Sequence, residues 1–236
     1  MHVAILGAGR LGRSFALLLP PAGHRVTLWR RDEAVPEADV YLLTVADDQI
    51  AEVAGRVPSN RPRLHCSGSR GVHVLGSSGE RGVLHPLMTF PGPGDGLPRL
   101  AGVGAGVSGT PVARALAEGL ARDLGLVPFV MPEDPVRYHA AAVIAGNHAA
   151  ALLLSAAELL AGPELPVEEA RRRLLPLALE SLRLAAERGP GALTGPTARG
   201  DRHTEELHLQ HIGAEHAASY AAVADQIRRL TSSFSR

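Results

Sequence analysis

The sequence predicts an α/β N-terminal domain with a doubly wound, mostly parallel sheet, followed by an all-α C-terminal domain. From Met1 to about Val130, short β-branched runs alternate with helical or turn segments, which is the pattern of a parallel sheet. After the stretch Met131-Pro132-Glu133-Asp134-Pro135, Ala, Leu, Glu and Arg dominate and the pattern becomes almost purely helical. We therefore place the domains at residues 1–131 and 132–236.

The first domain is expected to alternate strands with helices. The expected strands are residues 2–6, 25–29, 39–45, 63–66, 82–84, 100–107 and 126–130. The expected helices are residues 10–19, a helix capped by Asp47-Asp48 that runs through Val57, and residues 111–124.

The second domain is expected to consist of helices at residues 135–161, 167–188, 204–217 and 218–231. Asp134 is a good N-cap for the first of them, and Pro135 suits its first turn. Its apolar stretch is interrupted by Asn147, His148 and Ser155, so we interpret it as a buried helix and not as a membrane span. The segment 189–201 is too elaborate for a simple connector.

Composition excludes several classes of function. Acidic and basic residues balance at 24 each, and no basic stretch alternates with aromatic residues, so no nucleic-acid surface is expected. The chain contains no lysine, which excludes Schiff-base chemistry and a lysine general acid. The single cysteine, Cys66, excludes an internal disulfide, and the first residues form a strand instead of a signal peptide. We expect a cytoplasmic protein without membrane contact.

A glycine-rich turn follows the first expected strand. It reads Gly7-Ala8-Gly9-Arg10-Leu11-Gly12, and it opens a helix, which is the context that gives the Gly-x-Gly-x-x-Gly pattern its meaning. Gly7 permits the tight turn, Gly9 lets the backbone approach a pyrophosphate, and Gly12 lets the helix pack closely against the strand. The pattern predicts a Rossmann-like dinucleotide site; a domain that has lost its ligand is the alternative.

The cofactor is decided at the end of the second strand. NAD enzymes usually place an acidic residue there, whereas a 2′-phosphate favours arginine. The chain has Arg30 and Arg31 at this point, followed by Asp32. We predict NADP, bound by Arg30 with help from Arg31 or Arg10, while solvated arginines are the alternative and Asp32 keeps NAD open.

A second stretch should adjoin the cofactor. Thr44, Val45 and Ala46 end the strand that begins near Asp39, at the carboxyl edge of the sheet. Small residues there leave room for the ribose and nicotinamide half of the dinucleotide.

Several separate motifs together resemble one family. Besides the glycine turn they are Thr44-Val45-Ala46-Asp47-Asp48, His65-Cys66-Ser67-Gly68-Ser69, Leu84-His85-Pro86-Leu87-Met88-Thr89-Phe90, Tyr138-His139-Ala140-Ala141, Gly146-Asn147-His148 and the run from Leu193 to Asp201. The chain is similar over nearly its whole length to Rossmann-like proteins that carry the C-terminal domain of unknown function 2520.

That family is similar to pyrroline-5-carboxylate reductase, ketopantoate reductase and the β-hydroxyacid dehydrogenases. The resemblance implies an NADP-binding first domain, a helical second domain and a homodimer formed through the helices. It implies no substrate. The better-known relatives often use a lysine and an asparagine one turn apart; Asn147 can match the asparagine, but Val143 stands one turn earlier.

Hydride transfer to a carbonyl or imine requires a proton donor and groups that orient the substrate. The candidate catalytic residues are His85, His139 and Asn147, and the candidate substrate-binding residues are Ser67, Ser69, Arg199 and Asp201. Histidine titrates nearest neutral pH, so either histidine suits the role of donor. Asn147 lies in an otherwise apolar helix, where its amide needs a partner.

Each candidate also has a structural alternative. His85 can fix a loop before Pro86, and His139 can be a packing histidine. Asp201 can cap the next helix, and Arg199 can pair with Asp201 or with a carbonyl.

A group of histidines and glutamates near the C-terminus is a candidate metal site. It comprises His203, Glu205, His208, His211, Glu215 and His216, and Glu205 and His208 have the spacing of carboxylate-bridged metal sites. A second such motif is missing, so we predict no metal and interpret the group as a solvated or dimer-facing stripe.

These patterns give two hypotheses of different classes. The first is an NADP(H)-dependent oxidoreductase that acts on a small anionic carbonyl or imine substrate. The second is a non-catalytic NADP-binding sensor or assembly protein with the same fold.

Overall fold

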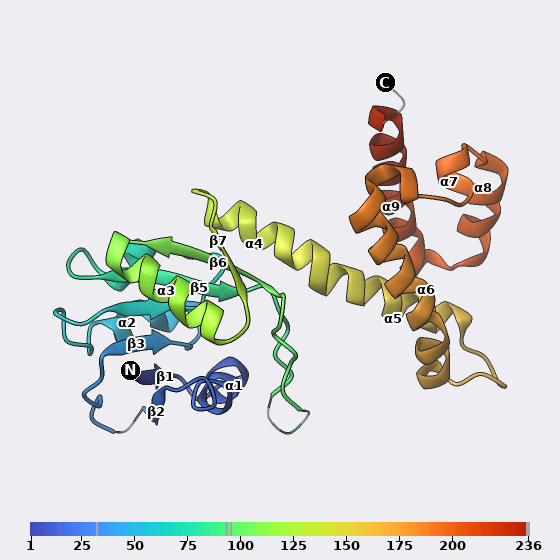
Figure 1. The fold of residues 1–236 in the computed structure, drawn as a ribbon. Helices are drawn as coiled ribbons and strands as arrows, with labels where there is room; N and C mark the ends of the chain where they lie inside the picture. Colours follow the sequence, from blue (N-terminus) through green and yellow to red (C-terminus); the bar gives the residue numbers. More distant parts are fainter. Residues whose placement is uncertain (32, 93, 95, 235–236) are drawn as a thin grey trace. The chain divides into compact units, whose positions relative to one another are not determined.

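The computed structural model describes residues 1–31, 33–92, 94 and 96–234. They form two compact units, Met1–Gly146 and Asn147–Arg236 (Figure 1). The first unit contains a seven-stranded sheet and the second is helical. The predicted fold class is therefore confirmed.

The sheet has the strand order β2-β1-β3-β4-β5-β6-β7. Pairing is parallel throughout except between β5 and β6, which are antiparallel. The strands are β1 (His2–Leu6), β2 (Arg25–Trp29), β3 (Val40–Leu43), β4 (Arg63–His65), β5 (Arg81–Pro86), β6 (Gly104–Gly109) and β7 (Val127–Val130). The expected strand 100–107 begins later than predicted, because residues 100–103 close a turn in which Val103 N donates to Leu100 O.

Helices cover both faces of this sheet. They are α1 (Arg10–Leu18), η1 (Asp47–Gln49), α2 (Ile50–Ala54), η2 (Val72–Leu75) and α3 (Pro111–Asp123). Side chains alternate along β1, so that Val3 and Ile5 join one core and Ala4 and Leu6 join the other. This alternation of fully buried residues is what a sheet covered on both faces requires.

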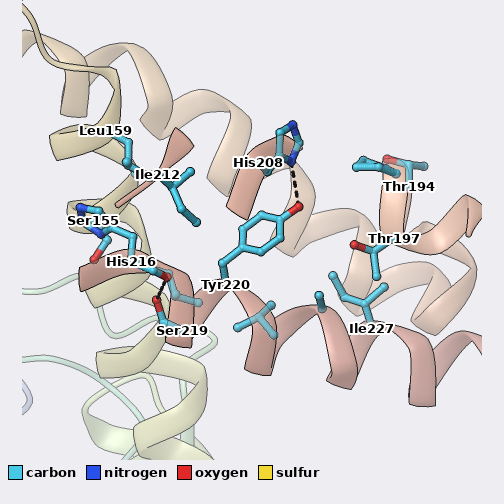
Figure 2. A pocket seen from close by; sticks show the side chains of 15 residues that line it. Ser155, Leu159, Thr194, Thr197, His208, Ile212, His216, Ser219, Tyr220 and Ile227 are labelled. Atoms are coloured by element: carbon cyan, nitrogen blue, oxygen red, sulfur yellow. Dashed lines mark hydrogen bonds between the residues drawn. The ribbon is translucent and has the colours of Figure 1, made fainter. Parts of the chain in front are cut away.

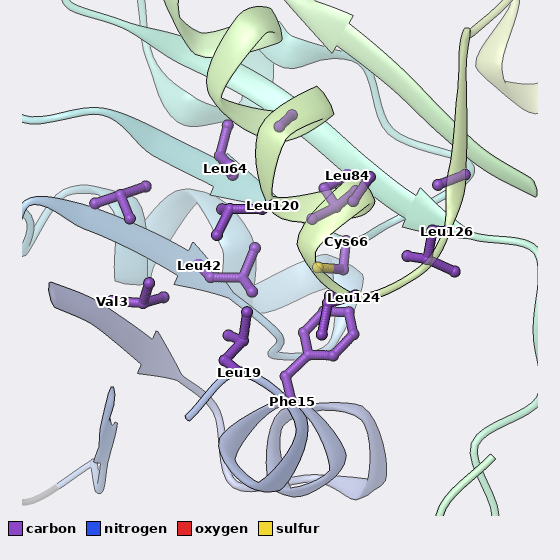
Figure 3. Close-up of a cluster of buried hydrophobic side chains, with 14 of the residues drawn as sticks. Val3, Phe15, Leu19, Leu42, Leu64, Cys66, Leu84, Leu120, Leu124 and Leu126 are labelled. Atoms are coloured by element: carbon purple, nitrogen blue, oxygen red, sulfur yellow. The ribbon is translucent and has the colours of Figure 1, made fainter. Parts of the chain in front are cut away.

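The core under α1 and α3 is the larger one (Figure 3). Phe15 of α1 is fully buried in it and packs edge-on against Phe90, with ring centroids 5.8 Å apart. Leu120 of α3 enters the same core between Leu64 and Leu42. The opposite core holds Trp29 at the end of β2. Packing on both faces fixes where each strand ends.

The last helix of the first unit continues into the second. The helical stretch comprises α4 (Pro135–Val143), a π-helical turn η4 (Ile144–His148) and α5 (Ala149–Leu160). As predicted, Asp134 caps α4, accepting from Arg137 N at 3.0 Å. The two units divide inside this stretch, at Gly146 and Asn147, whereas the sequence placed the boundary at 131 and 132. Tyr138 of α4 joins a core with Val83 of β5, which explains why α4 belongs with the sheet.

The second unit continues with α6 (Val167–Arg188), η5 (Gly189–Ala192), α7 (Pro196–Arg199), α8 (Arg202–His211) and α9 (Ala214–Phe234). The predicted break between residues 217 and 218 is wrong. The chain breaks at Gly213, whose φ of +75° ends α8 in the left-handed conformation that favours glycine. The segment 189–201 holds two short helices of its own, in keeping with its elaborate sequence.

The apolar stretch predicted to be a buried helix is exposed. By length and composition, Pro135–Leu160 could cross a membrane, with a mean hydropathy of 1.6 over its most apolar window. Only 6% of that window is buried within the chain. The prediction of burial failed because composition shows how apolar a helix is and not what covers it.

Candidate functional site

The topology of the sheet marks one edge as a binding site. β1 lies between β2 and β3, so the chain leaves β1 toward one side of the sheet and later returns on the other. In open parallel sheets ligands bind beyond the carboxyl ends of the strands at such a reversal. The glycine turn follows β1, and Thr44 follows β3, so both lie at this point.

The glycine turn is held tightly against the end of β3. The Thr44 hydroxyl donates to Gly7 O at 2.8 Å. A Cβ at Gly7 would lie 2.7 Å from the Thr44 carbonyl carbon, and one at Gly12 would lie 1.9 Å from Gly7 O. Gly9 differs, because no heavy atom lies within 4 Å of a Cβ placed there. Gly7 and Gly12 are thus required for packing, whereas the space at Gly9 is open.

The open space at Gly9 belongs to a cavity of about 380 Å³. It is lined by Ala8, Gly9, Arg10 and Arg13 together with Pro91, Gly92 and Gly94. The start of α1 has no side-chain cap, so its first N–H groups are available to an anion. Two arginines, open backbone and free N–H groups fit a pyrophosphate. Leu11 packs against the core and offers only its backbone to this space.

The end of β2 presents a cluster of arginines. Arg30 and Arg31 are both exposed, and Arg31 lies 3.9 Å from Glu52 of α2. Arg56, in the turn just after α2, stacks over the Trp29 ring, 5.9 Å from its centroid. Among the described residues Arg30 has no acidic partner. Asp32, which kept NAD open as a prediction, lies outside the described residues.

Polar side chains meet where β3 and β4 end. Ser67 Oγ and Ser69 Oγ both donate to Asp47 Oδ2, at 2.8 and 2.7 Å. Arg70 Nε lies 3.9 Å from the same oxygen. Asp47 and Asp48 make no capping hydrogen bond, so the predicted cap is wrong. Asp47 instead orients the two serines.

A second group of side chains continues from the first toward β5 and α4. His85 Nδ1 lies 2.9 Å from the Tyr138 hydroxyl, and the His139 ring stands edge-on to His85 at 6.0 Å between centroids. A Cβ at Gly68 would lie 2.7 Å from His85 Cε1 and 2.8 Å from His139 Cδ2. The loop between the two serines therefore lies directly on both histidine rings.

Burial sets the protonation of this group. Desolvation, reinforced by the neighbouring His139, lowers the pKa of His85 to about 4. Burial raises the pKa of Tyr138 to about 12, and the Tyr138 oxygen already accepts a hydrogen bond from the Gly106 backbone. We assign the Tyr138 hydroxyl as the donor to His85 Nδ1, which leaves the proton of the neutral imidazole on Nε2.

A third histidine, His65, holds the loop that carries the two serines through hydrogen bonds. His65 is fully buried, Ser67 N donates to its Nδ1 at 3.2 Å, and its Nε2 lies 3.3 Å from Gly71 O. Desolvation lowers the pKa of His65 to about 4. A neutral ring with its proton on Nε2 satisfies both contacts, so His65 holds the loop in place.

The remaining predicted residues belong to the second unit. Asn147 is exposed, so its amide does not need the internal partner expected from its apolar surroundings. Arg199 is exposed at the end of α7. Asp201 caps α8, accepting from Thr204 N at 3.1 Å and Thr204 Oγ1 at 2.7 Å. The capping alternative for Asp201 is confirmed, and α8 consequently begins before the predicted residue 204.

The stripe of histidines and glutamates does not come together. Within the described ranges no three His, Cys, Asp or Glu side chains are placed to hold a metal. Glu205 is buried and pairs with Arg228 at 2.6 Å, while His208 Nδ1 lies 2.8 Å from the Tyr220 hydroxyl.

Three residues of the site were not predicted. Asp47, His65 and Tyr138 stand in the motifs that carry the family resemblance, but none was assigned a role in the site, and Asp47 was expected only to cap a helix. For Asp47 the signal was its position at the carboxyl end of a parallel strand, which outweighs the capping preference of aspartate. For Tyr138 no signal in the sequence shows that α4 packs on β5.

The chain matches one family model, the domain of unknown function DUF2520, over residues 103–227. No curated protein sequence matches it significantly.

Several solved structures are similar over almost the whole chain. A Bacteroides fragilis protein, provisionally assigned as an NADP oxidoreductase, has a TM-score of 0.78 at 23% identity and covers 97% of this chain and 98% of its own. A Thermotoga maritima protein has a TM-score of 0.72 at 23% identity, covering 99% and 100%. An imine reductase from Streptomyces aurantiacus has a TM-score of 0.64 at 17% identity, covering 97% and 94%. At these identities the likeness establishes the shared fold.

Two histidines with lowered pKa values, the buried His65 and the partly buried His85, make stability depend on pH. In the unfolded chain both imidazoles take up a proton at about pH 6.5, but in the folded chain each does so only at about pH 4. The unfolded state therefore binds more protons between these values, and the free energy of unfolding should fall as the pH drops from about 6.5 to about 4. Urea unfolding across this pH range measures that free energy.

The double variant His65→Gln/His85→Gln should show a shallower dependence of the free energy of unfolding on pH, whereas His203→Gln, at an exposed histidine, should keep the wild-type slope. Equal slopes in all three proteins would contradict the assignment.

Proposed function

Because the chain belongs to the DUF2520 family, whose members share no assigned reaction, we propose its function from its own site: it is an NADP(H)-dependent oxidoreductase that reduces a small anionic imine or carbonyl compound. The observation that carries the proposal is the continuity of the site. An open glycine turn, a serine–aspartate cluster and a histidine–tyrosine pair lie at the ends of β1, β3, β4 and β5, which are neighbours in the sheet.

The residues present fit the dinucleotide. Gly9 and the uncapped N-terminus of α1 receive the pyrophosphate, with Arg10 beside it. Arg30, exposed and without an acidic partner among the described residues, binds the 2′-phosphate, assisted by Arg31. Thr44, Val45 and Ala46 leave room for the other half of the molecule. When bound, NADP(H) supplies the hydride.

His85 supplies a proton-bearing donor at neutral pH. Its imidazole is neutral, because burial lowers its pKa to about 4, and Tyr138 fixes the proton on Nε2. With a carbonyl substrate, a neutral N–H donor stabilises the negative charge that develops on oxygen, which then takes its proton from solvent. With a protonated imine, hydride addition leaves a neutral amine, and the same N–H serves to orient the substrate. His139, edge-on to His85, closes the same wall.

The serine–aspartate cluster favours an imine over a carbonyl. The hydroxyl protons of Ser67 and Ser69 are both directed to Asp47, so their oxygens remain as acceptors. Acceptors next to a carboxylate suit the N–H of a protonated imine. Arg70, half-exposed beside Asp47, provides the cation for a substrate carboxylate.

The absence of lysine favours one alternative, a non-catalytic NADP sensor, because the lysine chemistry of better-known relatives is unavailable here. The two functions share the cofactor site and differ in turnover.

The first test concerns the 2′-phosphate. Arg30→Ala should weaken NADPH binding about tenfold or more, since a charge-assisted hydrogen bond contributes roughly 1.5–3 kcal/mol, and it should leave NADH binding unchanged. Titration of cofactor fluorescence measures both. Arg61→Ala, an exposed arginine just before β4 and away from the carboxyl edge, is the control. An unchanged preference in Arg30→Ala would refute the assignment.

The second test concerns turnover. Incubation with NADPH and a panel of cyclic imino acids and oxo acids should give cofactor oxidation. His85→Gln should lower kcat about a hundredfold with NADPH affinity preserved, because it removes a positioned donor. Tyr138→Phe should lower kcat less, since the histidine keeps its place, and His203→Gln should be silent. Tight NADPH binding with no turnover across the panel would favour the sensor instead.

We also propose that the chain forms a homodimer through its helical unit. Large apolar side chains are exposed on the helices that follow the sheet, among them Ile144 of η4 at 55% and Leu177 of α6 at 66%. The ion pairs of Arg183 with Glu180 and Glu187 lie on α6 itself, so the surface as a whole is unsuited to lipid. A second copy buries such a face without burying these charges.

The dimer has a direct test. Leu177→Glu should convert a dimer to a monomer in light scattering coupled to size-exclusion chromatography, because it places a charge in the buried face. Leu17→Glu, at an equally large exposed leucine of α1, should remain dimeric. A monomeric wild type, or one that requires detergent, would contradict the proposal.

A further inference from the structure

The helical unit contains a cavity that the proposed reaction does not use. It has a volume of about 370 Å³ and is formed by α5, α7, α8 and α9 together with the residues beside them (Figure 2). Cavities of this size commonly bind small organic molecules. Every residue that lines it lies within the segment matched by the DUF2520 model.

The lining is mostly apolar and carries no formal charge. Its lining residues include no Arg, Asp or Glu. The apolar surface comes from Leu159 of α5, Ile212 just after α8, and Ile227 of α9. Figure 2 shows their side chains around the same space as Tyr220. Such a lining disfavours nucleotides and phosphorylated compounds, which require cationic partners.

One wall of the cavity is polar and held in a fixed geometry. The Tyr220 hydroxyl lies 2.8 Å from His208 Nδ1, and the two rings are edge-on with centroids 5.7 Å apart. Thr197 of α7 is buried and lines the same cavity (Figure 2). Glu205, on the same helix as His208, is buried, and its carboxylate pairs with Arg228 at 2.6 Å.

The wall also explains the segment 189–201. Thr194, Pro196 and Thr197 line the cavity, and Asp201 caps the helix that carries His208. The short helix α7 thus places a hydroxyl next to Tyr220, which a simple connector would not do.

We propose that this cavity is a binding site for a small, mainly apolar and uncharged molecule with a single hydroxyl or carbonyl group, which hydrogen-bonds at the Tyr220–His208–Thr197 wall. The site is separate from the dinucleotide site and does not depend on the proposed reaction.

The test uses benzyl alcohol and cyclohexanol as probes and benzoate as the charged comparison, with binding to the full chain followed by ligand-observed NMR. Both alcohols should bind saturably at one site per chain, and benzoate at least about tenfold more weakly. Tyr220→Phe should weaken the alcohols by about tenfold, because it removes the hydroxyl and keeps the ring.

Matched alanines supply the steric control. Ala156 lines the cavity, whereas Ala150 is exposed on the same helix and does not line it. Ala156→Leu should abolish probe binding, and Ala150→Leu should preserve it. Absence of saturable binding to the wild type would overturn the proposal, as would equal binding by wild type, Ala156→Leu and Tyr220→Phe. If the wild type binds no probe and Ala156→Leu loses the dimer, the cavity is occupied by a second copy of the chain. That outcome would also overturn the proposal.

Discussion

The close approach of the glycine turn to the end of β3 is the constraint on which the site depends. The hydrogen bond from Thr44 to Gly7 O joins the two strand ends where the chain reverses its direction across the sheet. It is possible only because neither Gly7 nor Gly12 has a Cβ. Once the turn is fixed, α1 starts with free N–H groups next to Gly9, and Asp47 follows Thr44 to a position from which it reaches the loop after β4.

Burial then sets the chemistry of the neighbouring strands. Desolvation keeps both His65 and His85 neutral, but the two rings have different roles. His65 hydrogen-bonds within its own loop and positions Ser67, whereas His85 is fixed from α4 by Tyr138 and keeps its Nε2 proton beside Gly68. Two histidines with the same lowered pKa thus provide a support and a donor, because different atoms surround them.

The sequence predicted those parts of the fold that depend on local pattern. The apolar runs of β1 and β2, the glycine turn and the cap at Asp134 follow from residue pattern and from backbone chemistry within a few residues, and the structure has them. Predictions that needed long-range packing fared worse. Aspartate at position 47 favours a helix cap, yet its carboxylate accepts hydrogen bonds from two serines that are about twenty residues later in the sequence.

The same reason applies to the helices and to the candidate site. The exposure of Pro135–Leu160 depends on what covers the helix, which its composition does not contain. The break at Gly213 was visible as a glycine but was outweighed by the helical character of its surroundings. His85 and His139 were predicted as separate candidates, and only the packing of α4 on β5 shows that they share one wall.

The most direct measurement of the central claim, that the glycine turn binds NADP(H), is the affinity of Gly9→Val for NADPH. A Cβ at Gly9 has no heavy atom within 4 Å, so the variant should unfold at close to the same urea concentration as the wild type. It should nevertheless lose NADPH binding, because the valine occupies the space of the pyrophosphate. Gly119→Val, at a glycine with equally open surroundings on α3, should bind normally. A folded Gly9→Val variant that binds NADPH as tightly as the wild type would contradict the claim.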